Sequence, residues 1–137
     1  MNKSLRLTKS KIEFVSKTWG YEKWLENNEL YCGKLLFFVK GRSCSAHYHK
    51  LKTETFYLHS GRVEVRFSDD LEELTNHLEL HGTEGILDYM EKEILEPGDT
   101  FFVPPGRIHM MIGLLDSELF EFSTFHSETD SFRLFRF

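Results

Sequence analysis

Short segments in which apolar and polar residues alternate follow one another along most of the chain. In "RVEVRF", Val63, Val65 and Phe67 alternate with charged residues, which is the period of a strand that buries one face. Gly61 lies between two such segments and predicts a tight hairpin that needs a positive φ. Further strand-rich segments are 34–41, 54–61, 88–99, 100–113 and 117–126. This density of short strands and turns predicts an antiparallel all-β fold, either a sandwich or a barrel.

The segment 68–88 interrupts this pattern. It contains seven acidic residues and no Lys or Arg, so its charge of −7 exceeds the net charge of −5 of the whole chain. Leu71, Leu74 and Leu78 follow helical spacing, so a short helix is possible here. We expect a short acidic insertion that is solvated at one end of the barrel, rather than a functional lid.

Composition limits the class of protein. With 137 residues, 40% of them apolar, the chain is expected to form a single domain over 1–137, with an N-terminal arm and entry strands over 1–30 and a barrel over 31–137. The acidic balance gives no reason to expect nucleic acid as a partner, and no stretch approaches a membrane span. Two cysteines do not make a disulfide framework, so reduced thiols and a cytoplasmic location are expected.

Two histidines and a glutamate lie close together in "HYHKLKTE". His47 and His49 share one side of an extended strand because side chains alternate between faces. Glu54 follows after an expected bend and can return to that side on the next strand. Two imidazoles and one carboxylate suit a divalent metal that takes a fourth ligand from a distant segment. His109 is the strongest candidate, since glycines and two adjacent prolines before it force turns that aim it inward.

The spacing of these residues resembles the paired motifs of the cupin superfamily. The first motif, G-x5-H-x-H-x4-E-x6-G, runs through Gly41, His47, His49, Glu54 and Gly61. The second, G-x5-P-x-G-x2-H, runs through Gly98, Pro104, Gly106 and His109. One departure is Gly113, where cupins often carry an asparagine that is not a metal ligand. The resemblance implies a double-stranded β-helix, or jelly-roll, barrel and one divalent metal ion (Zn, Mn, Fe or Ni) on His47, His49, Glu54 and His109.

The segments on either side of these motifs narrow the resemblance. "KTWGYEKW" at 17–24 is similar to the entry of type II mannose-6-phosphate isomerase domains, and "FEFSTFHSETDSFR" at 120–133 resembles the closing stretch of sugar-isomerase cupins. This similarity implies an enzyme that isomerises a sugar or a sugar phosphate, and it also implies a homodimer. In such a reaction the metal acts as a Lewis acid that stabilises an enediolate, while a base moves a proton between C1 and C2.

Glu121 is the first candidate for that base, because it is a carboxylate on an otherwise apolar strand. The flanking pattern does not determine whether it faces inward or outward. The other candidates are His126, Tyr57 and a metal-bound hydroxide. Candidate ligands for a phosphate or for sugar hydroxyls are Lys52, Tyr57, Arg107, Arg133 and, more weakly, Lys34 and His126.

Two other functions also agree with the sequence. A site of three histidines and one carboxylate suits the Fe(II) and O2 chemistry of a dioxygenase, and it also occurs in lyases. A non-catalytic sugar-binding cupin is the other alternative. His59, His77 and His81 have no partners at ligand spacing and are expected to face solvent, and Cys44 is expected to be a small buried side chain.

Overall fold

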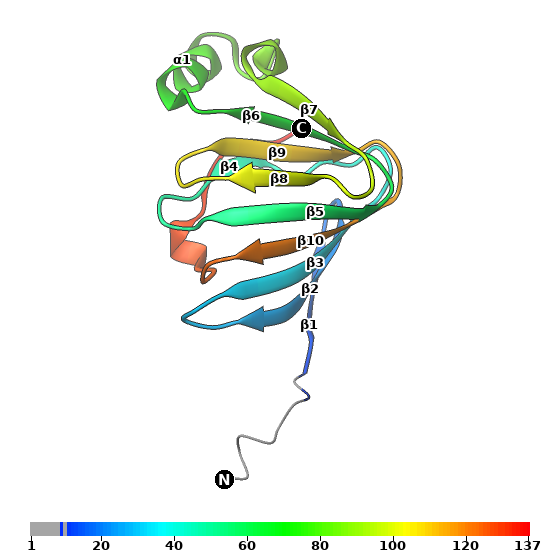
Figure 1. Ribbon diagram of the computed structural model, residues 1–137. Helices are drawn as coiled ribbons and strands as arrows, with labels where there is room; N and C mark the ends of the chain where they lie inside the picture. Colours follow the sequence, from blue (N-terminus) through cyan, green and yellow to red (C-terminus); the bar gives the residue numbers. More distant parts are fainter. Residues whose placement is uncertain (1–8, 10) are drawn as a thin grey trace.

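The protein is described from a computed structural model that covers residue 9 and residues 11–137. Two antiparallel sheets make up the fold (Figure 1). The six-stranded sheet has the order β1-β2-β3-β10-β5-β8, with β1 Glu13–Lys17, β2 Gly20–Asn27, β3 Cys32–Phe38, β10 Ser117–Ser123, β5 Glu54–Ser60 and β8 Thr100–Val103. The five-stranded sheet has the order β11-β4-β9-β6-β7, with β11 Phe132–Phe135, β4 Ala46–Tyr48, β9 Ile108–Gly113, β6 Val63–Ser68 and β7 Glu91–Leu95. The expected all-β jelly-roll is confirmed.

The main core lies between the two sheets. Alternate residues of each strand point into it, so that on β5 Phe56 and Leu58 are buried while Tyr57 is not. The buried cluster takes side chains from strands of both sheets: Trp19, Leu36, Phe38, Phe56, Leu58, Val63, Val65, Leu95, Phe101, Val103, Met111 and Leu119. This packing fixes which face of each strand lines the interior.

Gly61 forms the predicted hairpin between β5 and β6. Its φ is +93°, a region that side-chain-bearing residues rarely adopt. A Cβ at this position would also lie 2.3 Å from the Ser117 hydroxyl and 2.4 Å from the Asp116 carbonyl. Both the conformation and the space therefore require glycine here.

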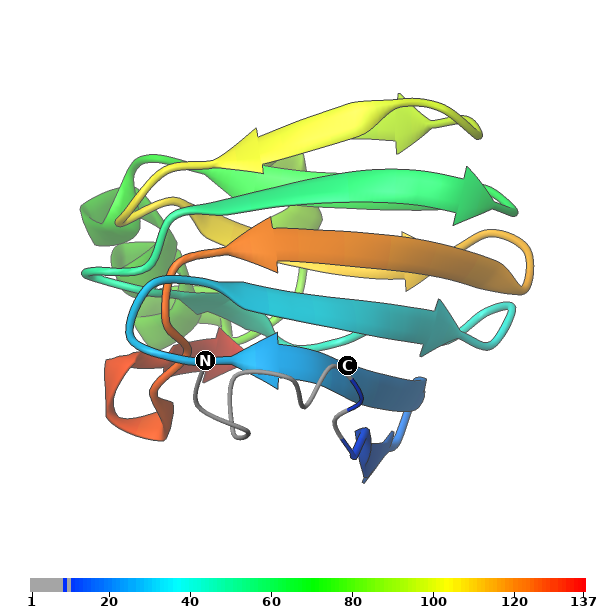
Figure 2. The same cartoon turned by 60° about the horizontal axis from the view of Figure 1, so that its bottom comes forward.

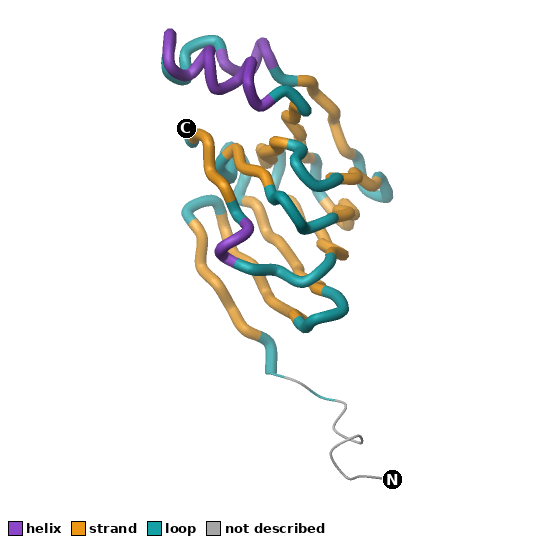
Figure 3. Tube along the Cα trace, turned by 90° about the vertical axis from the view of Figure 1, so that its left-hand side faces the viewer, coloured by secondary structure: helices purple, strands orange, loops and turns teal. Residues whose placement is uncertain are grey.

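The acidic segment folds as the helix α1 (Leu71–His81) and the 3-10 helix η2 (Ile86–Tyr89). Asp70 caps α1 by accepting a hydrogen bond from the Glu73 amide at 2.9 Å. All seven acidic side chains are exposed, but Leu74 and Ile86 are fully buried. Figure 3 shows these helices next to the C-terminal strand β11.

The expectation that this insertion is only solvated was therefore wrong. Leu74 and Ile86 belong to a second buried cluster, together with Ala46 of β4, Phe135 of β11 and residues of β9. The reason is that β9 is apolar on both faces: Met111 points into the main core, whereas its neighbours Ile108 and Met110 point outward and need a cover. Of the two histidines in this segment, His81 is exposed, but His77 is partly buried against Tyr89.

A search for membrane-spanning helices found none of sufficient length and apolar character in the part of the chain that the structure covers.

Candidate metal centre

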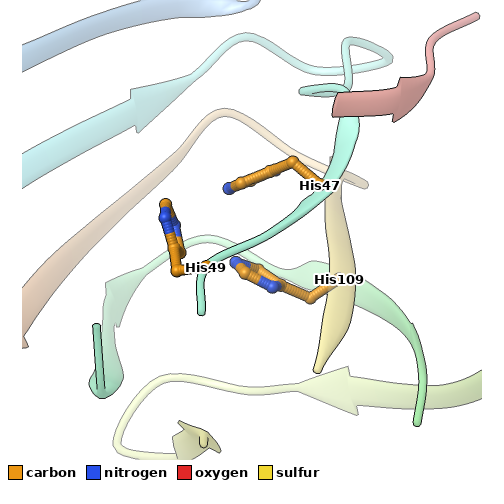
Figure 4. A group of neighbouring side chains, drawn as sticks. All are labelled: His47, His49 and His109. Atoms are coloured by element: carbon orange, nitrogen blue, oxygen red, sulfur yellow. The ribbon is translucent and has the colours of Figure 1, made fainter. Parts of the chain in front are cut away.

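Three histidines converge inside the sandwich. His47 lies on β4 directly opposite His109 on β9, and His49 follows just after the end of β4. One ligand nitrogen from each ring lies within 4.8 Å of the others. Figure 4 shows the three rings directed toward the same space between the strands. This is the cluster that the sequence spacing predicted.

Backbone carbonyls fix the tautomer of all three rings. The Nδ1 atoms of His47, His49 and His109 bond to the carbonyl oxygens of Ser45, Asp130 and Arg107 at 2.9, 2.6 and 3.0 Å. A carbonyl oxygen only accepts, so each neutral ring donates through Nδ1 and keeps a free lone pair on Nε2. Hydrogen bonds of this kind orient histidine ligands in metal sites.

Burial also keeps the imidazoles neutral. It lowers the pKa of His47 to about 3, and the neighbouring His109 contributes in the same direction. Burial likewise lowers the pKa of His49. Both rings are therefore uncharged at pH 7, which is the form that binds a metal.

Glu54 supplies an oxygen to the same space. Its side chain is 2% exposed, and its Oε2 lies 3.2 Å from the Nε2 of His109. Neither atom has a hydrogen-bond partner within the described part of the chain, although both are buried. Burial raises the pKa of Glu54, and the Lys52 ammonium 3.1 Å from Oε1 acts in the opposite direction. A charged oxygen and an imidazole nitrogen left without partners fit a cation bound between them.

Lys52 connects Glu54 to the predicted base. Its Nζ lies 3.1 Å from Glu54 Oε1, 2.8 Å from Glu121 Oε2 and 2.9 Å from His126 Nδ1, and the side chain is 3% exposed. Burial lowers the pKa of Lys52, but the two carboxylates outweigh burial and raise it. The ammonium therefore donates to all three neighbours, and the Glu54 carboxylate is held with Oε2 toward the histidines.

Glu121 faces the interior, a point that the sequence left open. It is 5% exposed and lies on β10 between Phe120 and Phe122, which point to the other side. Lys52 and the hydroxyl of Ser123, at 2.8 Å, both contact Oε2. Oε1 has no hydrogen-bond partner among the described residues. Glu121 is thus an ion-pair partner with one free oxygen.

His126 completes a polar chain at the edge of the site. Its Nδ1 accepts from Lys52, and its Nε2 lies 3.2 Å from Glu128 Oε1. Burial, followed by the charge of Lys52, lowers the pKa of His126. The ring is therefore neutral at pH 7 and donates through Nε2 to Glu128.

Asp130 organises this region, although no role was predicted for it. Its carboxylate accepts hydrogen bonds from the backbone amides of Lys50, Leu51 and Lys52 at 2.8–3.2 Å. Its carbonyl also accepts the Nδ1 proton of His49. Burial raises the pKa of Asp130, but the three amides outweigh burial and lower it. Asp130 therefore stabilises the loop that carries Lys52 and also determines the tautomer of His49.

A cavity of about 460 Å³ is lined by the three histidines, Glu54, Lys52, Glu121 and His126, with Trp24, Lys34 and Arg133 also in its wall. Lys34 is 3% exposed and lies over the Trp24 ring at 4.3 Å. Arg133 is exposed and donates to the Ser45 hydroxyl at 3.2 Å. The basic side chains in the wall are Lys17, Lys34, Lys52, Arg133 and Arg136, and the acidic ones are Glu22, Glu54, Glu121 and Glu128. Five basic and four acidic side chains leave the wall slightly cationic, in contrast to the acidic chain as a whole.

Two predicted substrate ligands lie outside this cavity. Tyr57 points away from the core, because it alternates with the buried Phe56 and Leu58. Arg107 forms two 3.0 Å hydrogen bonds with Asp69 at the start of the acidic segment. Both residue types can bind a substrate, which is why they were predicted as ligands. Strand phase directs Tyr57 away from the cavity, and the ion pair with Asp69 holds Arg107 outside it.

Cys44 and His59 behave as expected. Cys44 is partly buried beside both apolar clusters, and its Sγ accepts the Met111 amide at 3.3 Å. Burial raises the pKa of its thiol to about 11, so it stays protonated. His59 is exposed on the outer side of β5.

Comparison with known proteins agrees with this site. The family model described as Cupin matches residues 17–134. The chain belongs to the cupin family. A search of curated proteins found no significant match.

Solved structures share the cupin fold at low sequence identity. KdgF from Halomonas sp. is 19% identical with a TM-score of 0.63, and the match covers 88% of this chain and 92% of KdgF. An RmlC-like cupin from Shewanella frigidimarina NCIMB 400 is 19% identical with a TM-score of 0.65, covering 87% and 88%. The capsular polysaccharide assembling protein CapF from Staphylococcus aureus is 15% identical with a TM-score of 0.69, covering 92% of this cupin and 35% of CapF.

Proposed function

We propose that this cupin is a metal-dependent isomerase that acts on a sugar or a sugar phosphate. The observation that carries the proposal is one cavity in which three Nε2 lone pairs and a free oxygen of Glu54 lie beside a second carboxylate, Glu121, that has its own free oxygen. The first group suits a divalent metal, and the second suits a base that moves a proton.

His47, His49, His109 and Glu54 would hold the metal. When bound, a divalent metal acts as a Lewis acid that polarises a carbonyl oxygen and so makes the adjacent C–H more acidic. The chain's own residues would then transfer the proton.

Glu121 Oε1 is the atom that would carry the proton between C1 and C2. The contacts of Oε2 with Lys52 and Ser123 hold the carboxylate in place and leave Oε1 free to face the substrate. His126 accepts a hydrogen bond from Lys52 and donates one to Glu128. It would therefore orient Lys52 or a substrate hydroxyl.

The basic residues of the wall favour an anionic substrate. Arg133 and Arg136 are exposed side chains that line the cavity, and Lys17 is a third. Guanidinium groups bind phosphate oxygens in a bidentate way, so this side of the cavity would receive a phosphate. Lys52 and Lys34 lie deeper and would contact hydroxyl groups.

The test combines metal analysis with proton exchange. We expect the isolated protein to contain one divalent metal per chain, and His49→Ala to remain folded with markedly less. In deuterated water, the protein should introduce deuterium at C2 of aldose phosphates and at C1 of ketose phosphates. Glu121→Gln should keep the metal and lose about a hundredfold or more of this exchange, whereas the exposed Glu93→Gln is the matched control and should keep it.

Other outcomes would select another function. Consumption of O2 measured with an oxygen electrode would indicate a dioxygenase, because the same donor set suits Fe(II). Binding of metal and sugar without exchange at C1 or C2 would indicate a sugar-binding cupin. Unchanged metal content in His49→Ala would contradict the metal centre itself.

A further inference from the structure

Two histidines of the acidic segment lie on one side of the helix α1. His77 and His81 are four residues apart, the spacing that places helical side chains one above the other. Their ring centroids are 5.1 Å apart. Two histidines at this spacing on one face of a helix can bind the same metal ion.

His77 is held in place by its neighbours. Its Nε2 donates a hydrogen bond to the carbonyl oxygen of Glu84 at 2.5 Å, and its ring packs against Tyr89 with centroids 4.6 Å apart. Because a carbonyl oxygen only accepts, the neutral ring keeps its free lone pair on Nδ1. A hydrogen bond of this kind orients a histidine as a metal ligand. His77 is therefore a preorganised nitrogen donor.

His81 can supply a second nitrogen. It is the last residue of α1 and is exposed, so its ring can turn toward His77. Two nitrogens bound to one tetrahedral zinc ion lie about 3.4 Å apart, because each Zn–N bond is about 2.1 Å long. Rings whose centroids are 5.1 Å apart can present two nitrogens at this separation.

The charges around this histidine pair favour a cation. Both rings line a hollow of about 420 Å³, whose wall also contains the acidic residues Asp70, Glu72 and Glu73. Among the described residues, no lysine or arginine lines this hollow. His81 is also at the C-terminal end of α1, where the helix dipole stabilises positive charge.

The hollow is separate from the candidate metal centre. None of its lining residues also lines the cavity around His47, His49 and His109. In Figure 2 the six-stranded sheet faces the viewer and α1 lies behind it, on the side of the five-stranded sheet. An ion bound in this hollow would therefore be a second one.

We propose that His77 and His81 bind a second divalent transition-metal ion, with water in its remaining coordination positions. Imidazole nitrogens suit zinc, copper and nickel, whereas carboxylates alone suit magnesium and calcium. Because His77 is bonded to Glu84, the ion would fix the end of α1 to the loop that leads to η2. These two helices carry Leu74 and Ile86, so the ion would stabilise the cover of β9.

The test measures how much zinc the full chain binds. In equilibrium dialysis against Zn²⁺, the parent should bind one ion more than His81→Ala. The single imidazole left in the variant should bind zinc at least about tenfold more weakly, since even the loss of a residue that only orients a ligand costs that much. His81 is exposed, so the variant should fold and keep the circular dichroism of the parent. The matched control is His59→Ala, which removes an exposed histidine of β5 and should bind as much zinc as the parent.

Thermal unfolding gives a second readout. Zinc should raise the melting temperature of His49→Ala, and this rise should disappear in His49→Ala/His81→Ala, because an ion that binds only the folded chain stabilises it. Equal zinc content in the parent and His81→Ala, or a rise that persists in the double variant, would overturn the proposal. The difference between the parent and His81→Ala is one ion whether or not the first centre binds metal, so the proposed function is tested separately.

Discussion

The outer faces of the two sheets are both apolar, but they differ in whether other parts of the chain cover them. Both present apolar side chains on the side opposite the main core. On the five-stranded sheet, Leu74 and Ile86 from the acidic segment cover Ile108 and Met110. The six-stranded sheet has no such cover in the described chain, although it is the more aromatic of the two. The comparison indicates that one face contributes to the stability of the single chain, whereas the other remains exposed in the described chain.

The largest expected effect comes from breaking the cover of the five-stranded sheet. Leu74→Ala should lower the free energy of unfolding by about 2–5 kcal/mol, because it removes a fully buried side chain and leaves a cavity. Leu80→Ala on the exposed side of the same helix should change it by no more than about 0.5 kcal/mol. Urea denaturation measures both. Equal small effects would restore the view that the segment is peripheral, as its acidic composition suggested.

A smaller effect is expected at Asp130, which joins the site to β11 and hence to the covered sheet. Asp130→Ala removes the acceptor for three loop amides near His49 and Lys52. Because such supporting contacts orient metal ligands, metal affinity should fall about 10–100-fold while the fold is retained. Competition with a chelator measures the affinity. Unchanged affinity would mean that the loop keeps its shape without Asp130.

Acid should destabilise the protein partly by protonating Asp130. The pKa of Asp130 is lower in the folded protein than its ordinary value, so its carboxylate favours the folded state above about pH 4, the unfolded pKa. That contribution is lost as the pH falls below this value. Asp130→Asn should therefore show a weaker loss of stability between about pH 4 and pH 2 than the parent. Parallel acid titrations of the two proteins followed by circular dichroism test this, and superimposable curves would contradict it.

The smallest effect sharpens the contrast between the two faces. Phe122→Lys should change the unfolding free energy of the single chain by no more than about 0.5 kcal/mol, measured at a concentration where the protein is monomeric. The phenyl ring is more than half exposed, so little packing is lost. A loss comparable to that of Leu74→Ala would mean that the ring packs within its own chain.

The sequence by itself determined the set of candidate metal ligands. His47 and His49 share a side because strand side chains alternate. The bend between His49 and Glu54 and the turns before His109 return the other two side chains to the same space. These are local constraints of backbone geometry over a few residues. The strand segments follow from the same alternation, and the resemblance to cupins implied the jelly-roll architecture. The structure and the family match confirm both.

The tertiary structure decided everything that depends on which distant segments meet. It turned Glu121 inward against Lys52, paired Arg107 with Asp69, and brought Asp130 to His49. It also folded the acidic segment over β9 and, within residues 11–137, left the outer face of the six-stranded sheet exposed. The physical reason is that these contacts join residues far apart along the chain. Sheet register and the closure of the long loops determine them, and neither is encoded in the spacing of neighbouring residues.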